Sequence, residues 1–298
     1  MMFKRVPAAV FQAGLVVAWS SAYLGAILAS NTGSIVRVIL WRFVGVSLLL
    51  LPFLWKRVRN GVTWRWCALH RMLGAVGMFS CIGLGIEAIN LGLPAGTASL
   101  ISALQPLATA VLAGPILRET VVRGRWIGLG IGLLGVALSV GGLSGGDQIL
   151  GYLVCFGSMA SMVIATMIAK AKWDGTDLPA ALALQTIATA ALCVPLAIYN
   201  DAFWPQPSLQ FLGAVAWAIL FATVGAYGFY YICLMRLGAV RTSSLIYLTP
   251  PVTLLWAWAM FDQPISPYTV VGLLLCLAGV YLSRGKRSSF TGLSTEEA

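Results

Sequence analysis

Two ionisable side chains, Arg42 and Glu87, lie inside long apolar stretches of the chain. An ion in the hydrocarbon part of a membrane is unfavourable by several kcal/mol unless it is paired, so charges at such positions are functional by default. If each stretch is a helix, both residues lie roughly 7 to 10 Å below the same membrane face. The first interpretation is a mutual salt bridge. Two others stay open: Glu87 binds and releases protons, or the pair clamps a zwitterionic ligand.

Prolines occupy matched positions in two further apolar stretches, Pro106 in one and Pro251, preceded by Pro250, in the other. A proline inside a helix removes a backbone donor and collides with the carbonyl one turn earlier, so the helix kinks. The freed carbonyls then need a protein-lined or wet cavity. Both positions lie about nine residues into their stretches, near the membrane midplane. We therefore predict helix kinks at these prolines, facing a ligand site.

The side chains able to line such a site are polar, aromatic or sulfur-containing residues near the middle of the surrounding stretches. The predicted substrate-binding residues are Trp19, Ser20, Met78, Cys81, Ser102, Gln105, Met159, Tyr227, Tyr230, Tyr247 and Thr249. This lining is mostly apolar with scattered hydroxyls, which suits a neutral, partly apolar solute better than a phosphate or a polyanion. For any single residue, helix packing is the alternative interpretation.

Groups that could catalyse a reaction are scarce. The single histidine, His70, falls in a predicted cytoplasmic loop, and no apolar stretch contains a GxSxG motif, an HExxH motif or an aspartate pair. The six cysteines lack metal-type spacing, so we assign neither zinc nor a disulfide. We predict that the chain is not an enzyme and needs neither cofactor nor metal.

The elements that must position these residues are membrane helices. With 59% hydrophobic and 9% charged residues and a mean hydropathy of +0.90, the chain is no ordinary soluble globule, which carries about 25% charged residues. A helix needs roughly 20 apolar residues to cross the hydrocarbon. The predicted spans are Ala8 to Ala29, Ile35 to Trp55, Met72 to Leu91, Thr97 to Leu117, Trp126 to Leu143, Ile149 to Ala169, Leu178 to Tyr199, Gln210 to Leu234, Thr242 to Phe261 and Pro267 to Ser283.

The positive charges orient these ten spans, because Lys and Arg accumulate in cytoplasmic loops. With the N-terminus inside, all 19 basic residues except Arg37 and Arg42 fall on the cytoplasmic side, and the C-terminus lies there too. The same charges explain the formal net charge of +10. Because they sit in short loops next to membrane ends, we expect the lipid bilayer and not a nucleic acid as the partner.

The chain also contains an internal repeat. TASLISALQPL from Thr97 matches TSSLIYLTPPV from Thr242 at five of eleven positions, and GLGIGLLGVALS from Gly128 matches GLLLCLAGVYLS from Gly272 at seven of twelve. We predict an all-α membrane protein with two five-helix repeats, 1–145 and 146–285, and a cytoplasmic tail at 286–298. Because five is odd, the second copy is inverted, and two packings open to opposite sides are the basis of alternating access.

A small-residue-rich span, a proline, an acidic residue and a glycine-rich span follow one another from Pro106 through RETVVRGRWIGLGIGLLGVAL, with Glu119 as the acidic residue. With Trp19-Ser20 and Arg42-Phe43, this order resembles the EamA-type branch of the drug/metabolite transporter superfamily. The resemblance covers nearly the whole chain. It implies a ten-helix inner-membrane exporter of small metabolites, with amino acids as the first expectation and sugars, nucleosides or drugs as alternatives. We expect a monomer or a homodimer. The second copy departs from the pattern, with Asp262-Gln263-Pro264 where a glutamate is usual. A passive channel is the alternative.

Overall fold

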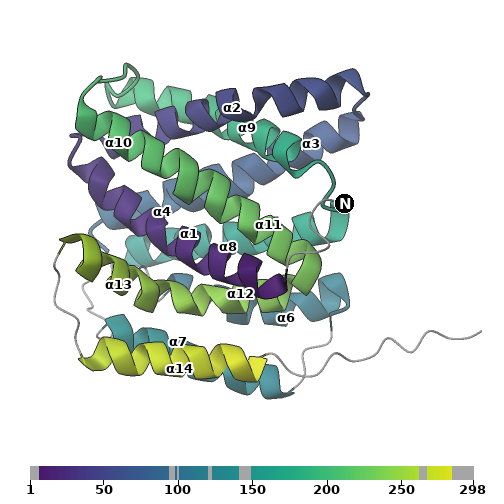
Figure 1. The fold of residues 1–298 in the computed structure, drawn as a ribbon, viewed down its shortest axis with the longest axis vertical. Helices are drawn as coiled ribbons and strands as arrows, with labels where there is room; N and C mark the ends of the chain where they lie inside the picture. Colours follow the sequence, from purple (N-terminus) through teal and green to yellow (C-terminus); the bar gives the residue numbers. More distant parts are fainter. Residues whose placement is uncertain are drawn as a thin grey trace, which may run out of the picture.

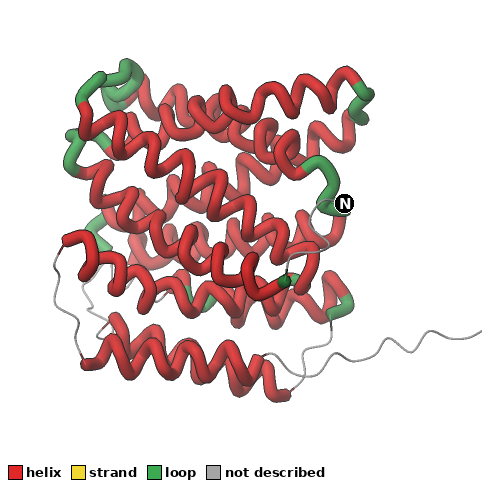
Figure 2. Tube along the Cα trace, in the orientation of Figure 1, coloured by secondary structure: helices red, strands yellow, loops and turns green. Residues whose placement is uncertain are grey.

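The computed structural model describes residues 7–93, 98, 101–119, 123–140, 149–261 and 267–283, and every regular element within these ranges is helical (Figure 2). Asp262-Gln263-Pro264 and the predicted tail lie outside them. In the first copy the helices are α1 (Ala8–Ser30), α2 (Ile35–Arg59), α3 (Trp64–Leu73), the π-helix η1 (Gly74–Ser80), α4 (Cys81–Asn90), α6 (Gln105–Leu117) and α7 (Arg123–Val140). In the second they are α8 (Ile149–Lys172), α9 (Leu178–Tyr199), α10 (Leu209–Trp217), the π-helix η2 (Ala218–Gly225), α11 (Ala226–Leu237), α12 (Ala239–Ser244), the 3₁₀-helix η3 (Leu245–Leu248), α13 (Thr249–Phe261) and α14 (Pro267–Ser283).

The lengths and compositions of these helices are those of a multi-pass membrane protein. Five helical runs are long and apolar enough to cross a bilayer: Ile35–Arg59, Trp64–Asn90, Ile149–Lys172, Leu178–Tyr199 and Leu209–Leu237. Shorter apolar helices lie in four of the other five predicted spans: Ala8–Ala22, Gln105–Leu117, Trp126–Gly135 and Val270–Leu282. Large apolar side chains such as Leu48 and Leu153 are more than half exposed on the outside, which suits contact with lipid. Membrane crossing by the shorter helices, and the side on which the termini lie, stay predictions.

Hydroxyl side chains fix where several helices begin. Ser34 Oγ accepts a hydrogen bond from the backbone N–H of Arg37, Thr63 Oγ1 from that of Trp66, and Ser208 Oγ from that of Phe211. Each hydroxyl satisfies a donor that the first turn of a helix leaves without a partner. Because Thr63 caps α3, the third helical run begins eight residues before the predicted Met72.

The main core lies where α1, α2, η1, α8, α9 and α11 meet. Leu15, Phe43 and Leu234 are completely buried there. Two polar contacts cross it: Ser47 Oγ donates to Thr186 Oγ1 at 3.1 Å, and Thr189 Oγ1 donates to the backbone oxygen of Gly74 at 3.0 Å. Buried hydroxyls paired in this way satisfy one another without bringing a charge into the core.

The most extensive helix contacts in the described residues join equivalent spans of the two copies. α7, in the fifth span, packs along α14, in the tenth, and α2 packs along α9, in the second and seventh (Figure 1). α6 and α12, in the fourth and ninth spans, also touch. Gly279 of α14 lies so near α7 that a Cβ there would come within 2.6 Å of the carbonyl oxygen of Gly128. Small residues allow this close approach of two backbones, as in membrane helix pairs generally.

Candidate substrate-binding site

The fourth and ninth spans are both interrupted at equivalent places. In the fourth, Ile101 and Ser102 are helical, Ala103 and Leu104 form a turn, and α6 starts at Gln105. In the ninth, α12 passes into the 3₁₀ turn η3, and α13 starts at Thr249. The start of α13 lies 144 residues after that of α6. Each span therefore consists of helical segments joined near its middle.

The predicted prolines mark these restarts, which corrects the expectation of kinks within continuous helices. Pro106 is in the first turn of α6, and Pro250 and Pro251 are the second and third residues of α13. The physical reason is that N–H groups in the first turn of a helix have no carbonyl partner within the helix, so proline loses no hydrogen bond there. The fixed φ of proline also suits helix initiation. The side chains of Pro250 and Pro251 lie outside the described part of the chain.

The third and eighth spans share a second irregularity. The third is π-helical at η1 and the eighth at η2, and η2 begins 144 residues after η1. In each segment a hydroxyl donates to the carbonyl five residues earlier: Ser80 Oγ to Ala75 and Thr223 Oγ1 to Ala218, both at 2.9 Å. π-helical segments are rare and occur mostly at functional sites.

Four aromatic side chains meet beside η1 and form what we call the aromatic cluster: Trp19 of α1 with Tyr227, Tyr230 and Tyr231 of α11. The Trp19 ring lies 5.5 Å from that of Tyr227 and 5.2 Å from that of Tyr230. The Tyr227 hydroxyl donates to the backbone oxygen of Gly77 in η1 at 3.2 Å, next to the buried Met78. The structure thus brings four predicted residues, Trp19, Met78, Tyr227 and Tyr230, into one region of the core.

Ser20 and Thr249 lie at the contact between α1 and the restart of the ninth span. Ser20 Oγ donates to the backbone oxygen of Val16 at 2.5 Å and approaches that of Thr249 at 3.3 Å. Thr249 Oγ1 donates to the backbone oxygen of Ile246 at 2.7 Å. Both hydroxyls are buried and donate hydrogen bonds to backbone carbonyls. In this conformation they therefore have little hydrogen-bonding capacity left for a ligand.

Of the other predicted residues, Cys81 packs on the same core as the aromatic cluster, and the rest lie in other contacts. Cys81 packs against Ser158, whose hydroxyl donates to the Cys81 carbonyl at 2.6 Å. Met159 packs on a small cluster with Ile101 and Cys155, Ser102 is half-buried, and Tyr247 lies against Gly132 of α7. Gln105 is buried at the start of α6, and its Nε2 has no partner among the described residues. Met159, Ser102, Tyr247 and Gln105 therefore lie in or beside the interrupted spans, outside the core cluster that holds Trp19.

The predicted salt bridge between Arg42 and Glu87 is wrong. Glu87 is exposed, and its Oε2 accepts a hydrogen bond from Asn90 Nδ2 at 3.3 Å. Arg42 lies with its guanidinium carbon 4.5 Å from the centre of the Phe43 ring, and its ionisable neighbours are Tyr227 and Cys193. The reason is helix packing: α2 lies against α9, whereas α4 lies against α8, so the two charges face different neighbours.

The EamA-like transporter family matches this sequence twice, over residues 7–141 and again over residues 149–285. The chain belongs to the EamA-like transporter family. Each match spans one of the two copies seen in the sequence, and the interrupted and π-helical spans lie at corresponding places within them.

The names of two relatives describe transport in opposite directions, one out of the cell and one into it. The probable terminal-alkyne amino-acid exporter of Streptantibioticus cattleyicolor is 27% identical over 71% of each chain. The S-adenosylmethionine uptake transporter of Rickettsia prowazekii is 26% identical over 86% of this chain and 83% of that protein. A crystal structure with 19% identity has a TM-score of 0.77, covering 93% of this chain and 96% of that one. At this identity the likeness shows a shared fold alone.

Glu119, the acidic residue of the EamA-like pattern, connects the two interrupted spans. It follows α6, and its carboxylate oxygens accept hydrogen bonds from the backbone N–H groups of Ala239 at 3.0 Å and Val240 at 3.4 Å. These donors belong to the first turn of α12, where a negative charge also complements the helix dipole. Glu119 of the first copy therefore caps a helix of the second.

The sequence analysis missed a buried polar network at His70, which lies inside α3 and not in a loop. Its Nδ1 is 3.1 Å from Gln185 Nε2, and Gln185 Oε1 accepts a hydrogen bond from the Tyr231 hydroxyl at 2.9 Å. The rings of Trp66 and Trp173 pack on His70 edge to face. The Thr63 capping residue was the signal that α3 begins early enough to contain His70.

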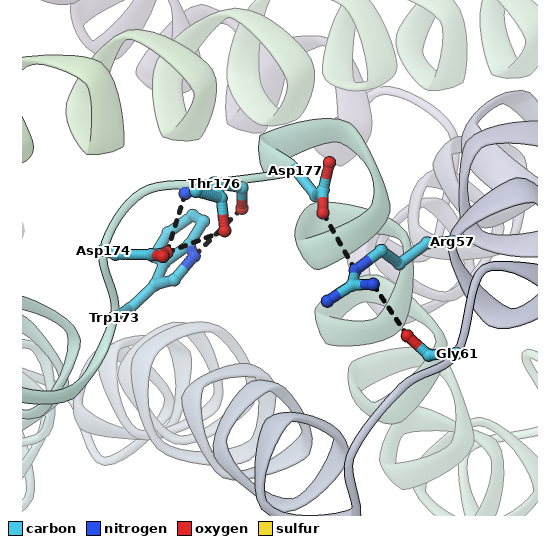
Figure 3. A network of polar contacts seen from close by, with 6 residues as sticks. All are labelled: Arg57, Gly61, Trp173, Asp174, Thr176 and Asp177. Atoms are coloured by element: carbon cyan, nitrogen blue, oxygen red, sulfur yellow. Dashed lines mark hydrogen bonds and ion pairs between the residues drawn. The ribbon is translucent and has the colours of Figure 1, made fainter.

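Figure 3 shows the polar contacts at the loop that carries Trp173. Trp173 Nε1 donates to the backbone oxygen of Thr176, and both the backbone N–H and the hydroxyl of Thr176 donate to Asp174. Arg57, at the end of α2, forms a 2.8 Å salt bridge with Asp177, the one ion pair among the described residues. Both partners are partly exposed, so this pair contributes at most about 1 kcal/mol. It joins the end of α2 in the first copy to Asp177, the residue before α9, in the second copy.

Proposed function

We propose that this chain is a secondary transporter that exports small amphipathic metabolites, amino acids first among them, across the inner membrane by alternating access. In this proposal ten spans form two inverted repeats with both termini in the cytoplasm. The substrate lies between the copies, bordered by the aromatic cluster on one side and the interrupted spans on the other.

The observation that carries the proposal is the placement of backbone irregularities at equivalent positions in both copies. Helix restarts at Gln105 and Thr249, and π segments at Gly74 and Ala218, are unfavourable inside a bilayer unless they line a protein or water-filled space. Alternating access exchanges the roles of the two copies, so a movable segment is needed in each. A chain that held one fixed packing would have no such need.

Two further observations support amino acids as the substrate class. The substrates in the names of the two relatives above both contain an amino-acid group. The aromatic cluster offers a mostly apolar surface, with the half-buried Trp19 ring still accessible. A substrate with one small polar end and an apolar side chain suits that combination.

Counterflow in liposomes tests the proposal. Purified protein is reconstituted into vesicles loaded with one unlabelled amino acid, and trace labelled amino acid is added outside, for each amino acid in turn. An alternating-access carrier concentrates the label transiently through exchange, whereas a passive channel only equilibrates it. Sugars and nucleosides run in parallel, and empty liposomes are the control. If no amino acid gives counterflow, the proposed function is wrong.

The direction of transport is tested with the same vesicles under an imposed proton gradient of either sign. For an exporter, we expect net flux from the face that carries Arg57 and Asp177, which the charge distribution makes cytoplasmic. Flux only toward that face would make the chain an uptake transporter.

A further inference from the structure

Arg42 is a cation inside a membrane-spanning helix for which the described part of the protein supplies no anion. It is the eighth residue of α2, and its Nε is buried without a hydrogen-bond partner. The described carboxylates that make contacts are engaged elsewhere: Glu87 with Asn90, Glu119 with the α12 backbone, Asp174 with Thr176 and Asp177 with Arg57. An unpaired charge in this environment is strongly unfavourable, so it calls for a ligand that brings the opposite charge.

Arg37, five residues earlier on the same helix, provides an internal contrast. Its Nη2 donates to the backbone oxygen of Asp201 at 3.1 Å, so Arg37 connects α2 to the loop between α9 and α10. That contact gives the Arg37 guanidinium one hydrogen-bond acceptor at Nη2, although its Nε, like that of Arg42, is buried without one. Arg42, deeper in α2, makes no hydrogen bond or ion pair with the described residues, and its guanidinium carbon lies 4.5 Å from the centre of the Phe43 ring.

The residues around Arg42 indicate what the part of the ligand beyond its anionic group is like. Tyr227, one of its two ionisable neighbours, belongs to the aromatic cluster, and its hydroxyl is held by Gly77. Phe43, whose ring the guanidinium contacts, belongs to the same core cluster as Tyr227 and the half-buried Trp19, so the cation lies near an apolar aromatic surface. A guanidinium presents parallel donors that match the two oxygens of a carboxylate. The geometry thus combines one anion-binding group with an apolar surface.

We propose that Arg42 binds the carboxylate of the substrate while the apolar part of the substrate lies against Trp19 and Tyr227. This inference rests on the proposed function, because it needs a transported small molecule, and it names the group that is recognised. A free carboxylate is required and a free ammonium is not, because no described carboxylate in contact with the aromatic cluster is available to pair with an ammonium.

Derivatives that remove one charge at a time test this directly. The probes are phenylalanine, leucine and methionine, their amides, which lack the carboxylate, and their N-acetyl forms, which lack the ammonium. Each competes with labelled amino acid for counterflow by wild-type protein. We expect the free acid and the N-acetyl acid to compete within about tenfold of each other, and the amide to be weaker by more than about thirtyfold.

Variants of the two arginines assign the effect to Arg42. Arg42→Gln should weaken the free acid by more than about thirtyfold and remove the difference between acid and amide. Arg42→Lys keeps the charge but not the paired donors, so an intermediate loss is expected. Arg37→Gln is the matched control, and its preference for the acid over the amide should equal that of wild type.

Stability separates a binding role from a folding role. Without ligand, Arg42→Gln should unfold at the wild-type temperature or higher, because an unpaired buried charge has been removed. If the amide competes as well as the acid in wild type, or if Arg42→Gln keeps the preference, Arg42 is not the carboxylate-binding residue although transport stands. If wild type gives counterflow with no probe, the proposed function fails as well.

Discussion

The two copies of this protein have the same irregular backbone but different side chains on it. Both have a π segment in the third span of the repeat and a restarted helix in the fourth. Counted from the first residue of each π segment, Tyr227 and Tyr230 of the second copy correspond to Gly83 and Ile86 of the first. The aromatic cluster therefore takes its tyrosines from one copy only.

Charge is divided unequally in the same way. Arg42 lies in the second span of the first copy, whereas the corresponding helix of the second copy, α9, contains no Lys, Arg, Asp or Glu. The first copy thus supplies the cation and Trp19, and the second supplies the three tyrosines of the aromatic cluster. In the proposed alternating-access mechanism, the shared backbone irregularities would serve the movement of both copies, and the unlike side chains would serve the recognition of a substrate with two unlike ends.

The largest expected effect comes from the start of the two π segments. A Cβ at Gly74 would collide with the backbone carbonyl of Gln185, whereas the corresponding Ala218 already carries a Cβ. Gly74→Ala should lower the free energy of unfolding by about 3 kcal/mol or more, because the obstacle is backbone. Ala218→Gly should lower it by about 1 kcal/mol. Thermal unfolding in detergent measures both, and equal losses would show that the two segments are packed alike.

The next effect concerns movement. Pro106→Ala and Pro251→Ala should each reduce transport roughly tenfold, equivalent to about 1.4 kcal/mol. Stability should change by less than about 1 kcal/mol, since both prolines lie near the beginning of a helix. In the proposed alternating-access mechanism the copies exchange roles, so cysteine labelling from each side should shift in opposite directions for the two variants. Pro179→Ala, at the start of the uninterrupted α9, is the control. Labelling identical to wild type in both variants would refute a role for the restarts in movement.

A smaller effect is expected at the contact between the interrupted spans. Glu119→Gln removes the charge that caps α12 while keeping one acceptor oxygen, and it should lower the free energy of unfolding by about 1 kcal/mol. Chemical denaturation in detergent measures this. A loss above about 3 kcal/mol would mean that Glu119 makes stabilising contacts beyond those with the first turn of α12.

The smallest effect is expected at Glu87, which corresponds to Tyr231 of the second copy. Glu87 is exposed, and its carboxylate bonds to Asn90 alone among the described residues, so Glu87→Gln should change stability by less than about 0.5 kcal/mol and leave the pH dependence of transport as in wild type. Counterflow between pH 5 and 8 checks this. A flattened pH profile in the folded variant would restore Glu87 as a proton-carrying residue.

The bounds of the helices were predicted from the sequence better than the contacts between helices. The spans Leu178 to Tyr199 and Pro267 to Ser283 begin and end at the same residues as α9 and α14, because hydrophobic length is set by the bilayer and bounded by polar residues. The meeting of Trp19, Tyr227 and Tyr230 also followed from their depth. Depth does not say which way a side chain points around the helix axis, so the Arg42–Glu87 pair was mispredicted. The π segments have no known sequence rule and were not foreseen.

The pairing of α2 with α9 and of α7 with α14 has a consequence for how the protein is made. The ribosome completes α2 and α7 long before α9 and α14 exist, so the first copy enters the membrane without its most extensive packing partners. Insertion and assembly are therefore separate stages. Between the two stages, lipid covers the faces of α2 and α7 that later pack on α9 and α14. The packing of the first copy is complete only after the second copy has been synthesised. A chain truncated near residue 145 would be inserted but left without its main partners, a species that membrane quality control removes.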